Sequence, residues 1–130
     1  VDDDGDVRRL LADQLSMLGA RAEAASDGPS ALAALGRARP DLLLVDYAMP
    51  GMTGADLARE ARRLWPGLPV VFATGYADSR AMEVAVGGGA RILRKPFRLA
   101  DLAEALREAL REGMGPTPLQ DDDAAGRAEP

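Results

Sequence analysis

The run DLLLVD at residues 41–46 decides the fold class, because it places four consecutive apolar residues between two acids. A strand that is apolar at every position is buried on both faces, and such strands belong to parallel sheets. A second run of this kind, PVVFAT, occupies residues 69–74. The two runs therefore predict two buried strands of a parallel sheet.

Helical patterns alternate with strand-like segments along the rest of the chain. Apolar residues recur at helical spacing over residues 7–18, 31–35, 57–64 and 99–110, and more weakly over 79–86. Shorter strand-like segments occupy residues 21–25 and 91–94. This alternation predicts an α/β fold with a doubly wound, five-stranded parallel sheet and helices on both faces. Only Val1 precedes the first acids, so we expect a truncated first strand with apolar residues missing upstream.

Polar residues and glycines mark the expected helix ends. Asp4 and Asp27 are predicted N-caps, and Gly19 is a predicted C-cap. Trp65 is expected to pack at the end of the helix over 57–64 rather than bind a ligand. We predict one domain over residues 1–112, followed by a disordered acidic tail over 113–130.

Composition excludes several classes of site. The chain has no Cys and no His, which excludes disulfides, thiolate or imidazole metal sites, cysteine nucleophiles and histidine bases. The net charge of −5 argues against nucleic-acid binding. No apolar run is long enough to span a membrane, so a cytoplasmic location is expected. All but one of the 16 basic residues are arginine, and the exception is Lys95.

Functional side chains follow the ends of the predicted strands. Asp2 and Asp3 follow the first strand, Asp46 the third, Thr74 the fourth and Lys95 the fifth. Ligands of open parallel sheets bind at the carboxyl ends of the strands. Clustered carboxylates need a cation, and hard oxygen donors with no soft ligands favour Mg²⁺. A lysine, a hydroxyl and a carboxylate nucleophile beside Mg²⁺ suit phosphoryl transfer.

Taken in chain order, these pieces resemble the receiver domain of bacterial two-component response regulators. The matching pieces are Asp2-Asp3, Asp46 with MPGMTG at 49–54, Thr74-Gly75 and Lys95-Pro96-Phe97. The resemblance covers residues 1–112 and implies a flavodoxin-like strand order of 2-1-3-4-5. The runs FATGY at 72–76 and RKPFRL at 94–99 are also similar to receivers attached to the C-terminal end of hybrid histidine kinases.

The resemblance implies a role for each of these residues. Asp46 would be the phosphoacceptor, taking a phosphoryl group from a phosphohistidine of a partner histidine kinase or histidine phosphotransfer protein. Lys95, joined to Pro96 by a cis peptide bond, would pair with a phosphate oxygen, and Thr74 would hydrogen-bond to the phosphate. Such a domain has no dedicated turnover activity. It would be a monomer or a weak phosphorylation-dependent dimer.

The resemblance also implies a metal site and a switch. Mg²⁺ would be held by Asp46, by Asp3 directly, by Asp2 partly through water and by the backbone carbonyl of Ala48. Phosphorylation would switch the face formed by residues 79–86, the strand 91–94 and the last helix. Candidate switch residues, besides Thr74, are Ile92 and Tyr76. Ile92 stands where the family usually has an aromatic residue, and Tyr76 either takes that role or is a loop aromatic.

Three alternatives stay open at this point. A pseudo-receiver would use the same fold as a phosphorylation-independent interaction module. A Mg²⁺-dependent phosphohydrolase would want a second acid two residues after Asp46, where this chain has Ala48. A calcium loop over residues 2–13 is weaker, because its glycine and its last ligand do not match such loops.

Overall fold

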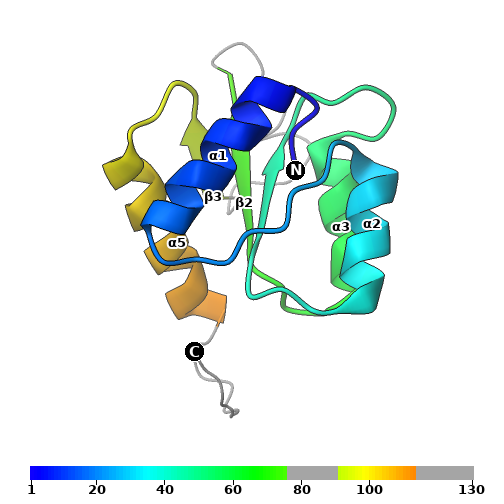
Figure 1. Cartoon of the computed structure of the whole chain (residues 1–130). Helices are drawn as coiled ribbons and strands as arrows, with labels where there is room; N and C mark the ends of the chain where they lie inside the picture. The colour runs from blue at the N-terminus through cyan, green and yellow to red at the C-terminus, as the bar shows by residue number, and fades with distance from the viewer. Residues whose placement is uncertain (76–90, 114–130) are drawn as a thin grey trace.

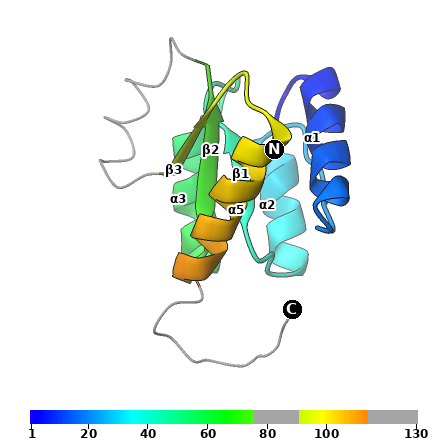
Figure 2. The same ribbon diagram turned by 90° about the vertical axis from the view of Figure 1, so that its left-hand side faces the viewer.

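The computed structural model describes residues 1–75 and 91–113. In that part of the chain three strands form one parallel sheet, in the order β1 (Leu43–Asp46), β2 (Val70–Thr74) and β3 (Arg91–Arg94). Four helices accompany them: α1 (Gly5–Met17), α2 (Gly28–Arg37), α3 (Gly54–Leu64) and α5 (Leu99–Gly113). Figure 1 and Figure 2 show helices on both faces of the sheet, as the sequence predicts.

The sheet separates two hydrophobic clusters. Alternate residues of β1 and β2 point to opposite faces, and every residue of both strands is buried. One cluster joins the sheet to α2 and α3, and its members include Leu35, Val45, Leu57, Ala61 and Phe72. The other joins it to α1 and α5, and its members include Leu11, Leu44, Val71, Leu93 and Leu102. This packing confirms the prediction that residues 41–46 and 69–74 hold strands buried on both faces.

The predicted five-strand order is not confirmed, because only three of the expected strands form within the described residues. Two other segments nevertheless approach the edge of the sheet at β1. The Val1 nitrogen donates to the Leu44 carbonyl at 2.6 Å, and the Asp46 N–H donates to the Val1 carbonyl at 2.8 Å. The Asp2 N–H donates to the Ala25 carbonyl at 3.2 Å. Residues 1 and 2 therefore lie between β1 and the segment around Ala25.

Residues 21–25 were predicted to form a strand, but in the structure they form neither strand nor helix. Residues 21–24 are exposed, and only Ala25 packs against the core. A strand of small or charged residues with no buried face has nothing to fix its register.

The helix ends follow local chemistry. Asp4 and Asp27 are N-caps, as the sequence predicts, and Gly19 follows α1 with a φ of 85°. Thr53 and Asp56 add a capping box at the start of α3, which was not predicted from the sequence. These caps position the first turns of helices that begin at the same edge of the sheet as the predicted site.

Several predictions fall on residues that the structure does not describe. These are the helix over 79–86, Tyr76 and the tail beyond residue 113. Helix α5 reaches Gly113, one residue past the predicted domain boundary. No helix in the described part of the chain has the length and apolar character needed to cross a membrane.

Candidate functional site

The parallel register brings the carboxyl ends of the strands together. Asp46 pairs with Ala73, and Thr74 pairs with Arg94, the residue before Lys95. Beyond this ladder the Lys95 N–H donates to the Thr74 carbonyl at 2.9 Å. The Lys95–Pro96 peptide bond is cis, as the resemblance implied. The predicted residues at the ends of β1, β2 and β3 therefore meet at one edge.

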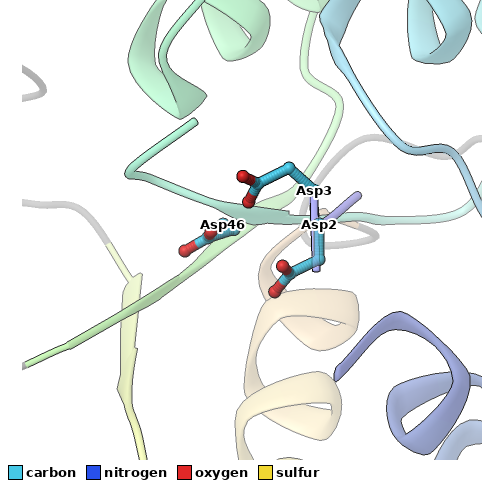
Figure 3. Close-up of side chains that lie close together, drawn as sticks. All are labelled: Asp2, Asp3 and Asp46. Carbon is cyan, nitrogen blue, oxygen red and sulfur yellow. The ribbon is translucent and has the colours of Figure 1, made fainter. Parts of the chain in front are cut away.

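Three carboxylates gather there, and Figure 3 shows them together at the end of β1. Asp2, Asp3 and Asp46 each offer one oxygen, and these oxygens lie within 4.8 Å of one another. Asp2 is 1% exposed and Asp46 is 7% exposed, whereas Asp3 is exposed. The positions of these residues directly after the predicted strands indicated this convergence.

Lys95 lies inside the acidic cluster. Its Nζ is 3.0 Å from Oδ2 of Asp2 and 3.3 Å from Oδ1 of Asp46, so one ammonium is shared by two buried carboxylates. The side chains of Asp2, Asp3, Asp46 and Lys95 together leave an excess of negative charge, and two of the three carboxylates are buried. A divalent cation would balance that excess.

The titration of the two central groups reflects this imbalance. Burial raises the pKa of Asp46, and the charges of Asp2 and Asp3 raise it further, while Lys95 opposes them. Burial alone would lower the pKa of Lys95, but its hydrogen bonds and attraction to Asp2 and Asp46 outweigh this and raise it. Lys95 therefore stays charged at neutral pH, and the Asp46 carboxylate gains from any added positive charge.

The donor set fits Mg²⁺. Mg²⁺ takes carboxylate, carbonyl and water oxygens, and it is commonly held by one or two carboxylates with phosphate oxygens completing its shell. Asp46 and the exposed Asp3 offer carboxylate oxygens of this kind. Both carboxylate oxygens of Asp2 already accept hydrogen bonds within the protein. The Asp4 N–H donates to Oδ1 at 2.9 Å, and Lys95 donates to Oδ2. Ala48 lies in the loop that follows β1, two residues after Asp46.

The predicted switch residues occupy different surroundings. Thr74 is fully buried, and its Oγ1 donates to the Gly75 carbonyl at 3.2 Å. Ile92 pairs with Phe72 in the sheet and packs, half-buried, against the cluster under α2 and α3. Tyr76 lies outside the described residues. Thr74 is thus at the site, whereas Ile92 packs against the core under α2 and α3.

Two residues near the site were missed from the sequence. A Cβ on Gly54 would lie 2.6 Å from the Asp46 carbonyl oxygen and 2.8 Å from Cα of Tyr47, so only glycine allows α3 to begin against the backbone of Asp46. Arg8 donates from Nη1 to the Asp2 carbonyl at 2.9 Å. Gly54 is the last residue of the MPGMTG motif at 49–54, but the sequence alone does not indicate that it lies against the backbone of Asp46.

Comparison with known proteins gives a family. Residues 1–107 match the family model described as the response regulator receiver domain. The chain is 39% identical over 127 residues to response regulator MprA of Mycobacterium ulcerans (strain Agy99), covering 96% of this chain and 53% of MprA. It is 36% identical over 115 residues to the response regulator receiver protein CpdR of Brucella abortus (strain 2308), covering 84% of this chain and 92% of CpdR.

A solved structure agrees with the sequence matches. The crystal structure of the receiver domain of NtrX from Brucella abortus superposes with a TM-score of 0.78 at 34% identity, covering 85% of this chain and 94% of that one. The chain spans about half the length of MprA, so the longer protein's activity is not carried over from that match. On the family match, these identities and the shared fold, the chain belongs to the response regulator receiver domain family.

Proposed function

We propose that this domain is a phosphoacceptor, and that Asp46 receives a phosphoryl group from a phosphohistidine of a partner histidine kinase or histidine phosphotransfer protein. Membership of the receiver family supports a role in two-component signalling. The observation that carries the proposal is the contact of Lys95 with both Asp2 and Asp46, beside the carboxylate of Asp3.

The transfer needs no reactant other than the donor phosphohistidine and one proton from solvent. A carboxylate oxygen of Asp46 attacks the phosphorus, an O–P bond forms and the N–P bond to the donor imidazole breaks. The electron pair of the broken bond stays on the imidazole nitrogen, which takes a proton. Because this chain has no histidine, the donor belongs to another protein or domain.

The other residues stabilise the charge that arrives with the phosphoryl group. Lys95 Nζ, already 3.3 Å from Asp46 Oδ1, is placed to donate to a phosphoryl oxygen. The hydroxyl of Thr74 exchanges its bond to the Gly75 carbonyl for one to phosphate. Mg²⁺, held by Asp3, Asp46 and the Ala48 carbonyl with Asp2 behind them, would neutralise negative charge on the phosphoryl oxygens.

Phosphorylation switches the face that includes β3 and α5, with Thr74 as the residue that senses phosphate. Residues 79–86, which we also assign to the switch, lie outside the described residues. The domain acts in the cytoplasm, as a monomer or weak phosphorylation-dependent dimer, without turnover activity and without contacting nucleic acid itself. The relatives described above are named as response regulators or receivers, and they give no support to a place in a hybrid histidine kinase.

Intact mass after incubation with MgCl₂ and acetyl phosphate tests the function. We expect one phosphoryl group on the wild-type domain, dependent on Mg²⁺ and absent from Asp46→Asn. Asp13→Asn is the matched control, because Asp13 is an exposed acid on α1 outside the site and loses the same charge. A folded protein that gains no phosphoryl group would overturn the proposal and favour the pseudo-receiver alternative.

A further inference from the structure

Arg8 connects α1 to the backbone of Asp2, and none of the roles proposed above involves this residue. The side chain is half-buried, and its Nη1 donates to the Asp2 carbonyl at 2.9 Å. A Cβ on Gly5 would lie 3.6 Å from Nη2, so the guanidinium folds back over the first residue of the helix. Arg8 therefore reaches the backbone of Asp2 from its own helix, and it donates to a carbonyl and not to a carboxylate.

Three hydrogen bonds close a ring through this residue. The Asp4 N–H donates to Asp2 Oδ1 at 2.9 Å, and the Arg8 N–H donates to the Asp4 carbonyl at 2.9 Å. The side chain of Arg8 then returns to the Asp2 carbonyl. Asp3 is the residue enclosed between these contacts. Its backbone is thus held on both sides, while its carboxylate is exposed and faces the cluster.

We propose that Arg8 is a positioning residue, which holds the Asp2–Asp3 backbone so that both carboxylates are pre-arranged for a divalent cation. The inference rests on the proposed function, and it assigns Arg8 no contact with the cation or with phosphate. Groups that orient metal ligands from behind commonly change metal affinity by about 10- to 100-fold when they are removed.

Electrostatics and positioning predict opposite signs for the loss of Arg8. A guanidinium near three carboxylates repels an incoming cation, so removing its charge alone would tighten Mg²⁺ binding. Removing the hydrogen bond to the Asp2 carbonyl loosens the backbone that carries Asp2 and Asp3, which weakens binding. The sign of the change therefore separates the two effects.

The test compares Arg8→Met with Arg9→Met by calorimetric titration of the folded domains with MgCl₂. Arg9 lies on the same turn of α1 and is exposed, and its ion pair with Asp6 is a long one of 3.7 Å. Both variants lose one positive charge. We expect the dissociation constant of Arg8→Met to rise about tenfold, and that of Arg9→Met to stay within about twofold or fall slightly.

Two further measurements separate positioning from general loosening and from failure of the function itself. Leu11→Ala removes core packing of α1, and we expect it to lower the melting temperature while leaving Mg²⁺ affinity unchanged. Without Mg²⁺, the Asp4 amide should exchange its hydrogen faster in Arg8→Met than in Arg9→Met, because its acceptor on Asp2 is no longer held.

Unchanged or tighter Mg²⁺ binding in Arg8→Met, with wild-type binding intact, would overturn the role of Arg8 and leave the proposed function standing. Equal weakening in Leu11→Ala would also overturn it, because the effect would then be general loosening. A wild-type domain that binds no Mg²⁺ and gains no phosphoryl group would overturn the function, and the assignment of Arg8 with it.

Discussion

The ammonium of Lys95 lies 3.0 Å from the carboxylate of Asp2, although the two residues are 93 positions apart in the chain. The contact spans the sheet edge from the residue after β3 to the segment beside β1. Asp46 shares the same ammonium at 3.3 Å, so the lysine holds together two carboxylates that would otherwise repel each other in a buried place. A change to any one of these three side chains should therefore alter both the stability of the fold and the charge around Asp46.

Neutralising Asp46 is expected to stabilise the metal-free fold. The pKa of Asp46 is raised in the folded state, above all by burial. The stability that this group contributes is therefore fully present below its ordinary pKa of 3.8, and it is lost as pH rises through the folded pKa. Asp46→Asn should therefore melt at a higher temperature than wild type at neutral pH, and this advantage should shrink below pH 3.8. Thermal unfolding with EDTA at several pH values measures it.

Added MgCl₂ provides the control for that experiment. Mg²⁺ should raise the melting temperature of wild type more than that of Asp46→Asn, because the variant has lost one anionic ligand. A variant that is less stable than wild type at neutral pH without Mg²⁺ would contradict the expected repulsion.

Removing the shared ammonium is expected to have the opposite effect. Lys95→Met leaves Asp2 and Asp46 buried without their common partner, and we expect a loss of about 1–3 kcal/mol in the free energy of unfolding without Mg²⁺. Denaturant titration at neutral pH measures the loss. Arg107→Met, at an exposed position of α5, removes the same charge and should change stability little.

The double variant gives the sharper comparison. Adding Asp46→Asn to Lys95→Met should recover part of the stability, because one of the two unpaired carboxylates is then neutral. Equal stability losses in the Lys95 and Arg107 variants would rule out a structural role for the ammonium.

Gly54 is expected to tolerate no side chain. Gly54→Ala forces a Cβ against the Asp46 carbonyl and Cα of Tyr47, which must move apart, and the expected cost is about 1–3 kcal/mol of stability with slower phosphorylation of Asp46. Gly36→Ala is the matched control. Gly36 is exposed within α2 with open space around its Cα, so alanine there should stabilise by about 0.5–1 kcal/mol.

Chemical denaturation and acetyl phosphate labelling of the two glycine variants check this pair. Normal labelling of Asp46 in a destabilised Gly54→Ala would show that the close approach serves the fold and not the site.

The N-cap of α2 predicts a pH-dependent stability that is independent of the site. Asp27 accepts a hydrogen bond from the Ser30 N–H at 2.8 Å, and this bond lowers its pKa below 3.8. The stability that Asp27 contributes is therefore fully present above pH 3.8, and it is lost as pH falls through the lowered pKa. Asp27→Ala should be less stable than wild type at neutral pH, and the difference should narrow in acid.

Asp27→Asn separates the cap from the charge. Asparagine also caps helices and does not titrate, so this variant should keep the cap at both pH values. Thermal unfolding of the three proteins at pH 7 and in acid measures the pattern, and a difference between wild type and Asp27→Ala that does not depend on pH would refute it.

Local features could be predicted from the sequence because their causes are local. The uninterrupted apolar runs at 41–46 and 69–74 require burial on both faces, and short polar residues such as Asp4 and Asp27 satisfy the open N–H groups of the helices that follow. The packing of Trp65 at the end of α3 was also predicted, and its indole donates to the Leu35 carbonyl at 2.9 Å. The strand over 21–25 failed because its exposed residues carry too little burial to fix a register.

By itself the sequence determined which side chains follow the strands, and parallel strands bring such ends to one edge whatever the rest of the fold does. Only the tertiary structure decided which of those side chains contact one another and which are exposed. It places the ammonium of Lys95 between Asp2 and Asp46, leaves Asp3 exposed and sets Gly54 against the Asp46 backbone. These contacts depend on register and packing between segments far apart in the chain, and no local pattern of residues encodes a distance of that kind.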